Sequence, residues 1–192
     1  MGYLSDETID EITESIKIIP LSNDFDINSY IFDCGIKEYN NFLNFAFSYD
    51  EMNVSKTHLL IHKERNLLLG YITLSTDSIK LTQEEKDDCE LIDVKFRSIP
   101  AIKIGKLAIN KNLPDELKRK GYGSYLIEWA RGFAGIVNLS GVACRFLTVD
   151  ADIEYNDDTP IFYKKNGFKQ NQANRNKKSQ TVSMRLDIIS EE

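Results

Sequence analysis

Two glycines one residue apart, directly after three cations, are the part of this sequence best suited to chemistry. The stretch reads Lys118, Arg119, Lys120, Gly121, Tyr122, Gly123 and Ser124. Glycine lets the backbone curl so that successive N–H groups point at one spot. A helix that begins at Tyr122 adds its free N–H groups and the positive end of its dipole. The stretch therefore predicts a site for an anion, a diphosphate above all, although an ordinary helix start has the same pattern.

Regular elements are expected on both sides of the glycines. A β-rich segment, 99–110, comes before them. After them, apolar residues at helical spacing predict a helix over about 122–135. These residues are Tyr122, Tyr125, Leu126, Trp129, Ala130 and Phe133. Strand, glycine loop and helix follow one another in the order that phosphate-binding loops use.

A second segment near the C-terminus, 156–168, has the pattern of a short helix between a polar loop and a strand. Pro160 stands in the first turn of that helix, where a missing N–H does no harm. Gly167 is expected to end the helix as a C-cap, and Phe168 to begin the next strand.

Together, the two segments resemble the GNAT superfamily of acyl-CoA N-acyltransferases. The family's glycine motif, Gln/Arg-x-x-Gly-x-Gly/Ala, is matched by Gly121 and Gly123, with Lys118 in the first place. Its late motif, an asparagine and then a helix ending Phe-Tyr-x-x-x-Gly-Phe, is matched by Asn156 and by 162–168. The resemblance implies an α+β fold over 16–188, with a mixed, mostly antiparallel central sheet flanked by helices. An acidic N-terminal arm at 1–15 precedes it.

The remaining elements are predicted from apolar periodicity and turn residues. They are a strand at 16–21, a helix at 36–47, a hairpin of strands at 57–62 and 67–75, and strands at 145–149 and 181–188. Residues 76–98 are expected to be irregular, with the acidic run 84–90 as a solvated face or a surface loop. Residues 110–117 are longer than the family's usual link and are expected to bulge out as an extra half-turn.

The resemblance also implies which residues bind acetyl-CoA, the co-substrate. The backbone of Leu107, Ala108 and Ile109 would bind the pantetheine arm and the thioester oxygen, at a bulge that opens the central strand. The glycine loop would bind the diphosphate, with Lys118 attracting phosphate without the planar fork of an arginine. The further coenzyme-binding residues are Arg119, Lys120, Gly121, Tyr122, Gly123, Ser124, Asn156 and Phe162.

Tyr163 stands where many family members have the tyrosine that protonates the departing thiolate. A phenol of pKa about 10 can donate to a thiolate whose thiol has a pKa of about 8.5, provided the pocket is dry. A core aromatic role is the alternative for Tyr163, and a helix N-cap is the alternative for Asn156. No general base is assigned, since the spacing of His58 and His62 is more typical of structural residues, and no metal site is expected.

The N-terminal half resembles one branch of the superfamily, the toxins that acetylate the amino group of aminoacyl-tRNA. The similar element is Phe32-Asp33-Cys34-Gly35, then a helix with Tyr39 and Phe42-Leu43. It implies an acetyltransferase in which a primary amine attacks acetyl-CoA directly in a ternary complex. The acceptor stays open between aminoacyl-tRNA, a protein amine and a small amine, and a non-catalytic acyl-CoA-binding regulatory module is the alternative from another class. A homodimer and an antitoxin partner are also left open.

A basic run near the C-terminus fits an RNA partner. No acidic residue occurs from Thr159 to Leu186. The cations of that stretch are Lys164, Lys165, Lys169, Arg175, Lys177, Lys178 and Arg185. With 118–120 they are expected to form an electropositive rim for the phosphates of tRNA or for the 3′-phosphate of coenzyme A. A solvated basic loop is the alternative.

Composition limits the class of protein. A net charge of −6 over 192 residues argues against a general nucleic-acid coat. Cys34, Cys89 and Cys144 lack CxxC or histidine pairing, which is typical of thiols in a reducing cytosol. Residues 1–12 lack the basic-then-apolar pattern of a signal peptide, and no apolar stretch approaches the roughly 20 residues of a membrane span. A cytoplasmic protein with no membrane partner is expected.

Overall fold

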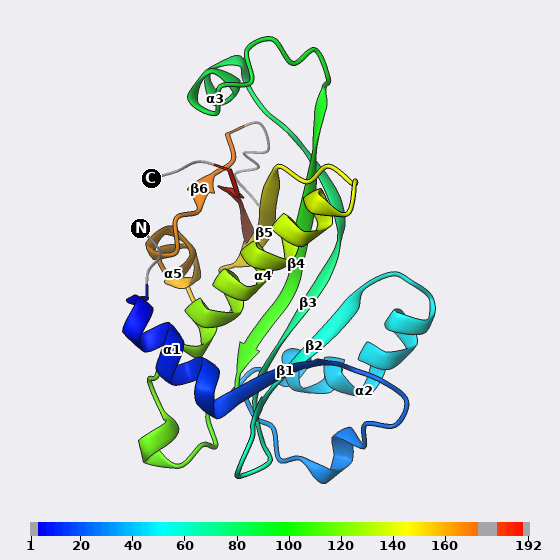
Figure 1. Cartoon of the computed structure of the whole chain (residues 1–192), viewed down its shortest axis with the longest axis vertical. Helices are drawn as coiled ribbons and strands as arrows, with labels where there is room; N and C mark the ends of the chain where they lie inside the picture. The colour runs from blue at the N-terminus through cyan, green and yellow to red at the C-terminus, as the bar shows by residue number, and fades with distance from the viewer. Residues whose placement is uncertain (1–3, 173–179, 190–192) are drawn as a thin grey trace. The chain divides into compact units, whose positions relative to one another are not determined.

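The computed structural model describes residues 4–172 and 180–189. Within these residues, seven strands form one sheet in the order β1-β2-β3-β4-β5-β7-β6, with helices beside it (Figure 1). Contacts divide the chain into two compact units, each described by itself below. The glycine-loop unit comprises 4–75 and 105–128, and the β5–β7 unit comprises, among the described residues, 76–104, 129–172 and 180–189.

The predicted elements occur in the predicted order, with some changes of boundary, and two further helices lie at 6–15 and 83–88. The helices are α1 Asp6–Ser15, α2 Lys37–Glu51, α3 Gln83–Asp88, α4 Tyr122–Leu139 and α5 Thr159–Lys165, with 3-10 turns at Ile27–Ser29 and Asp115–Leu117. The strands are β1 Ile16–Pro20, β2 Lys56–His62, β3 Leu67–Lys80, β4 Ser98–Ile109, β5 Phe146–Asp152, β6 Lys169–Gln170 and β7 Thr181–Asp187. The turn at 115–117 lies where the sequence predicts an extra half-turn.

The sheet is mixed, as predicted. β1 pairs with β2, β2 with β3, β5 with β7 and β6 with β7 in antiparallel fashion, whereas β4 pairs with β5 in parallel. No helix among the described residues is both long enough and apolar enough to traverse a bilayer.

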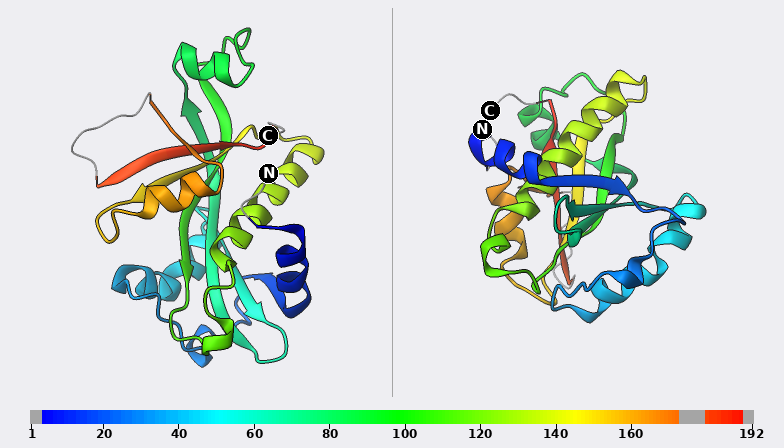
Figure 2. Two further views of the ribbon diagram at one scale, coloured as in Figure 1. Left: turned by 90° about the vertical axis from the view of Figure 1, so that its left-hand side faces the viewer. Right: turned by 60° about the horizontal axis from the view of Figure 1, so that its bottom comes forward.

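In the glycine-loop unit, α2 packs on the β2–β3 hairpin. Leu43 and Ala46 of α2 are buried in one cluster with Leu59 and Tyr71 of the hairpin. The Tyr71 hydroxyl donates to the Tyr39 carbonyl at 2.8 Å, so the polar end of this buried ring is paired. Figure 2 shows α1 running directly into β1 at the start of this unit. The predicted site residues of this unit lie at the end of β4 and at the start of α4.

Asn110 fixes the chain where it leaves β4. Its side chain is buried, and its Nδ2 donates to the carbonyls of Ile31 and Leu68 at 2.9 Å each. Its Oδ1 accepts from the N–H groups of Asp33 at 3.3 Å and Asn112 at 2.9 Å. One amide thus joins three segments, and the link toward the glycine loop begins from a fixed point.

In the β5–β7 unit, β5 is the central strand. Its Phe146–Val149 segment lies in parallel register with Ala101–Ile104 of β4, and the full length of β5 pairs with β7. Phe146 and Leu147 are fully buried, as expected of a strand with neighbours on both sides. Because both neighbours fix β5, they also fix the position of its carboxyl end, from which the chain continues to α5.

The prediction of irregular structure over 76–98 is wrong. β3 continues to Lys80, and Thr82 then begins α3 with a capping box: its Oγ1 accepts from the Glu85 N–H, and the Glu85 carboxylate accepts from the Thr82 N–H. This Thr-x-x-Glu pattern is a sequence signal for a helix start, but it lies inside an acidic run that resembles a surface loop.

The prediction that the acidic run 84–90 is a solvated face is also wrong at Glu85. Its side chain is buried and forms an ion pair of 2.5 Å with Arg185 of β7, which is equally buried. The other Glu85 contact across the fold is the Gln172 N–H, at 2.7 Å. A buried carboxylate needs such partners, and nothing local in the sequence shows that the partner lies 100 residues away.

Candidate active site

The glycine loop has the backbone conformation that its sequence predicts. Arg119 and Gly121 both adopt positive φ, +58° and +84°, and α4 begins at Tyr122. The Tyr125 N–H donates to the Gly121 carbonyl at 2.9 Å, which is the first bond of the helix. The N–H groups before Tyr125 are the ones that a helix leaves without intrahelical partners. The loop therefore presents donors and the positive end of an 18-residue helix in the same place.

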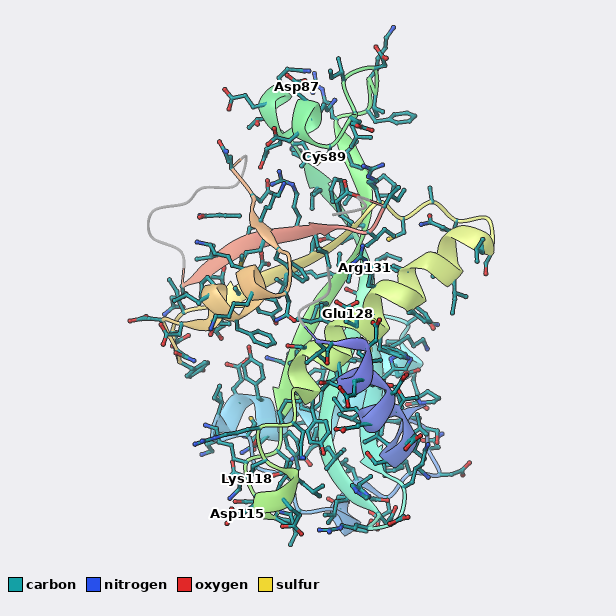
Figure 3. The ribbon with its side chains drawn as sticks, turned by 60° about the vertical axis from the view of Figure 1, so that its left-hand side comes forward. Asp87, Cys89, Asp115, Lys118, Glu128 and Arg131 are labelled. Atoms are coloured by element: carbon teal, nitrogen blue, oxygen red, sulfur yellow. The ribbon has the colours of Figure 1, made fainter. Side chains whose placement is uncertain are left out.

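The cations of the loop are exposed, but not equally available. Lys118 Nζ lies 2.8 Å from Asp115 Oδ1, in the turn that precedes the loop (Figure 3). The hydrogen bond and charge of Lys118 lower the pKa of Asp115, so the carboxylate stays charged and offsets the Lys118 charge. Arg119 and Lys120 form no ion pair with a described carboxylate, so they carry most of the positive charge toward an anion.

α1 supports the loop from the N-terminal side. A Cβ at Gly121 would lie 2.8 Å from Cδ2 of Leu4, so any side chain there would meet Leu4 as well as strain the backbone. The Thr13 and Tyr125 hydroxyls lie 3.1 Å apart. Tyr122 and Ser124 are buried beneath the loop, which fixes the first turn of α4.

The β4 segment predicted to bind the thioester is irregular at its start. The Lys106 N–H donates to the Thr73 side-chain hydroxyl at 2.7 Å, at the position where the resemblance implies a bulge. Leu107 and Ile109 are half-buried and Ala108 is buried. Lys106 Nζ is 2.8 Å from Glu38 and 4.3 Å from the centre of the Tyr39 ring, which joins α2 to this part of β4.

The helix with the late motif has the predicted start and end. α5 begins at Thr159 with Pro160 in its first turn, and Gly167 follows the helix at φ +83°. Tyr163 is only 6% exposed, and its ring meets those of Phe162 and Phe168 edge-on at 5.1 and 5.2 Å between centroids. The phenol is thus held in dry, aromatic surroundings.

Asn156 helps to shape the turn before α5. Its Oδ1 accepts from the Asp158 N–H at 3.0 Å, and its carbonyl accepts from the Thr159 N–H at 3.1 Å. The side chain is exposed. The N-cap of α5 is Asp158, with no side-chain capping bond, so Asn156 shapes the preceding turn and is not the N-cap that the sequence leaves as the alternative.

The predicted site residues are divided between the two units. Leu107–Ile109 and 118–124 belong to the glycine-loop unit. Asn156, Phe162 and Tyr163 belong to the β5–β7 unit.

The predicted basic rim needs one correction. Arg185 cannot serve it, because its guanidinium is buried and paired with Glu85. Lys164, Lys165 and Lys169 are exposed. The remaining members, Arg175, Lys177 and Lys178, lie outside the described residues.

Metal-ligating side chains and histidines are the remaining candidates for chemistry within the described residues. No three His, Cys, Asp or Glu side chains there converge as a metal site would require. Burial lowers the pKa of His58 from its ordinary value, so the imidazole is neutral near pH 7. His58 lies on β2 with Pro20 of β1 and Ile72 of β3 opposite it, and it stays unassigned.

The order of elements defines a GNAT-like α+β fold, as the resemblance implies. No protein-family model matches the sequence, and no curated protein matches it.

Solved structures share this fold over most of the chain. A tyrosine-to-phenylalanine variant of the toxin AtaT, bound to the C-terminus of the antitoxin AtaR and acetyl-CoA, is 23% identical, with a TM-score of 0.63 over 88% of this chain and 92% of that chain. AtaT complexed with acetyl-methionyl-tRNAfMet is 21% identical, with a TM-score of 0.66 over 88% and 93%. A tyrosine-to-phenylalanine variant of KacT is 22% identical, with a TM-score of 0.67 over 88% and 94%. At these identities the likeness establishes the fold.

Proposed function

We propose that this protein is an N-acetyltransferase that moves the acetyl group of acetyl-CoA to a primary amine. The observation that carries the proposal is the loop at Gly121. Its positive φ and the start of α4 leave backbone N–H groups without intrahelical partners, next to two exposed cations. An AtaT structure of the same fold contains acetyl-CoA, which supports this choice of anion.

The chain's own residues divide the binding work. The N–H groups of 120–124 bind the diphosphate, because they are the unpaired donors at the start of a helix. Arg119 and Lys120 add positive charge beside it. The backbone of Leu107 and Ile109 binds the pantetheine arm and donates to the thioester oxygen, where negative charge develops in the transition state. Asn156 and Phe162 complete the coenzyme contacts by family resemblance.

The chemical step is a direct displacement in a ternary complex. The neutral amine attacks the thioester carbonyl carbon, a C–N bond forms, and the C–S bond breaks as the tetrahedral intermediate collapses. The Tyr163 phenol gives its proton to the departing thiolate, the proton lost by the amine passes to solvent, and the Tyr163 phenolate takes a proton back from solvent. Aromatic neighbours on both sides of Tyr163 support this role, since a dry setting disfavours a thiolate that stays charged.

We propose aminoacyl-tRNA as the acceptor. The AtaT structure that contains acetyl-methionyl-tRNAfMet supports this class, and so does the toxin-like element at 32–43. An antitoxin partner is proposed on the AtaT–AtaR structure. Three buried, free thiols support a cytoplasmic location.

Radiolabelled acetyl-CoA tests the proposal against its rivals. The protein would be incubated with aminoacyl-tRNA, deacylated tRNA, a peptide with a free amino terminus, and a small diamine. We expect label in the aminoacyl-tRNA only. Label in the peptide or the diamine instead would reassign the acceptor. Tight acetyl-CoA binding by calorimetry without label in any acceptor would favour the non-catalytic module.

A further inference from the structure

A second basic site lies within the β5–β7 unit and uses none of the residues assigned above to acetyl-CoA or to catalysis. A depression of about 370 Å³ lies beside α3. It is lined by Lys80, Leu81, Gln83, Lys86, Lys95, Phe96 and Arg97. Four of these seven side chains are cationic and none is acidic. The volume is in the range of small-ligand pockets, roughly 300–1,000 Å³.

The cations of this α3 pocket are not neutralised within the described structure. None of Lys80, Lys95 and Arg97 forms an ion pair there, and all three are exposed. Lys86 Nζ donates to the carbonyls of Val94 at 2.7 Å and Phe96 at 3.1 Å, and these two bonds fix the loop. The positive charge is confined to the lining of the pocket, because the same segment also contains the exposed acidic residues Glu84, Asp87, Asp88, Glu90 and Asp93.

Phe96 gives the pocket a second chemical feature. Its ring is 74% exposed and stands in sequence between two cations, Lys95 and Arg97. A single exposed ring is common on protein surfaces, so the relevant feature is its position beside cations. Cations beside an exposed aromatic ring suit a nucleic-acid strand, whose phosphates meet the charges while a base stacks on the ring.

The pocket is held in place by buried contacts. Glu85, next to Lys86, forms the ion pair with Arg185 of β7 and closes the capping box with Thr82. Lys86 in turn holds the 94–96 loop that carries Phe96. A site supported in this way loses little entropy when a ligand binds.

We propose that the α3 pocket binds an unpaired stretch of RNA, with Lys95 and Arg97 on phosphates and Phe96 stacked on a base. The proposal rests on the proposed function for the choice of RNA, because tRNA is the acceptor proposed above. It adds a contact surface that belongs to neither the glycine loop nor the basic run near the C-terminus. Acidic side chains of the same segment oppose it: Asp87 accepts a hydrogen bond of 2.8 Å from the lining residue Gln83, and Glu84, Asp88, Glu90 and Asp93 are exposed.

Fluorescence anisotropy of labelled tRNA, without acetyl-CoA and at several salt concentrations, tests the proposal. A plot of the logarithm of the association constant against log salt has a negative slope. The double variant Lys95→Gln/Arg97→Gln should make this slope shallower by roughly 1.4 to 1.8, about 0.7 to 0.9 for each phosphate that the variant no longer neutralises. Phe96→Ala should weaken binding about fivefold or more, because a base would have no ring on which to stack. Asp87→Asn should tighten binding.

Matched controls separate the pocket from general effects. Lys17→Gln/Lys37→Gln removes two exposed charges elsewhere, and Phe45→Ala removes a ring that is 60% exposed on α2. Both controls should leave the slope and the affinity near the wild-type values. If the pocket variants behave like these controls, or if tRNA fails to bind the wild type at low salt, the proposal is overturned. Equal competition by polyglutamate of matched charge would assign the pocket to acidic peptides and overturn it too.

The same variants distinguish this proposal from the proposed function. Pocket-dependent tRNA binding by a protein that acetylates no acceptor would uphold the pocket and refute the acetyltransferase. The Lys95→Gln/Arg97→Gln variant could instead acetylate aminoacyl-tRNA with unchanged kcat/KM and bind tRNA as the wild type does. This result would uphold the acetyltransferase and refute the pocket.

Discussion

Tyr163 combines a buried ring with a hydroxyl that the proposed reaction needs. Its neighbours are Phe162 and Phe168, so its packing is aromatic on both sides. Removal of the hydroxyl alone leaves these ring contacts in place. The side chain can therefore be tested for chemistry without a large effect on the fold.

We expect Tyr163→Phe to lower kcat by about 10²-fold or more, the usual contribution of a positioned acid. Affinity for acetyl-CoA should be unchanged, because the phenol acts on the departing thiolate. Tyr155→Phe is the matched control, since Tyr155 lies outside the motif and is 45% exposed. Steady-state kinetics at saturating acetyl-CoA would show the difference. Full activity in Tyr163→Phe would leave the tyrosine with a packing role only.

The start of α4 is the element that the proposal depends on most. Gly123 lies in its first helical turn, in an ordinary helical conformation, whereas Gly121 is at positive φ beside Leu4. A substitution at Gly121 would therefore perturb both the fold and the site. Gly123 offers the cleaner test of diphosphate binding.

Gly123→Asp should weaken acetyl-CoA binding by tenfold or more while stability is retained. A carboxylate is favourable at a helix N-terminus, but there it repels a diphosphate bound to the same N–H groups. Gly132→Asp in the same helix is the control, because no atom lies within 4 Å of a Cβ at that position. Calorimetry gives the affinity and thermal unfolding gives the stability. Unchanged affinity in Gly123→Asp would remove the diphosphate from the loop.

α3 and β7 are joined by the Glu85–Arg185 pair, and this pair makes stability depend on pH. Burial raises the pKa of Glu85, but the N–H groups of Gln172 and Thr82 and the Arg185 guanidinium lower it more, so the net pKa is below the ordinary value of 4.5. A carboxyl group with a lowered pKa contributes stability above its unfolded pKa. That contribution is lost as pH falls through the folded value.

Glu85→Gln should cost about 3–5 kcal/mol at pH 7, because Arg185 stays buried without its partner. Below about pH 4.5 the wild type should lose stability more steeply than the variant, so the two should converge. Glu84→Gln, an exposed neighbour, should follow the wild type throughout. Urea unfolding at several pH values measures this. Parallel curves for wild type and Glu85→Gln would show that the pair does not set the pH dependence.

At the scale of the whole molecule, the sequence predicts what local rules control. The positive φ at Gly121 and Gly167 and the helix starts beside them follow from residue types within a few positions. The Glu85–Arg185 pair joins residues 100 positions apart, and no local pattern announces it. The Thr82–Glu85 capping box is present as a local pattern, but the acidic run around it has the composition of a surface loop.

The candidate site is predictable to the same extent. The motifs place the loop at 118–124 and Tyr163, because glycine, proline and aromatic residues have strong local preferences. They do not reveal that Asp115 offsets Lys118, or that Leu4 lies against Gly121, since both contacts depend on how segments pack. The α3 pocket is missed for the same reason: its lining residues come from two stretches, 80–86 and 95–97, which acidic residues separate in the sequence and which only folding brings together.

The most direct test of the central claim is the identity of the modified atom on the acceptor. Aminoacyl-tRNA would be incubated with acetyl-CoA and the protein, digested with ribonuclease, and the released aminoacyl-adenosine analysed by mass spectrometry. We predict the addition of one acetyl group on the α-amino nitrogen with the wild type, and a greatly reduced yield with Tyr163→Phe and with Gly123→Asp. An unmodified aminoacyl-adenosine, or equal acetylation by all three proteins, would contradict the claim.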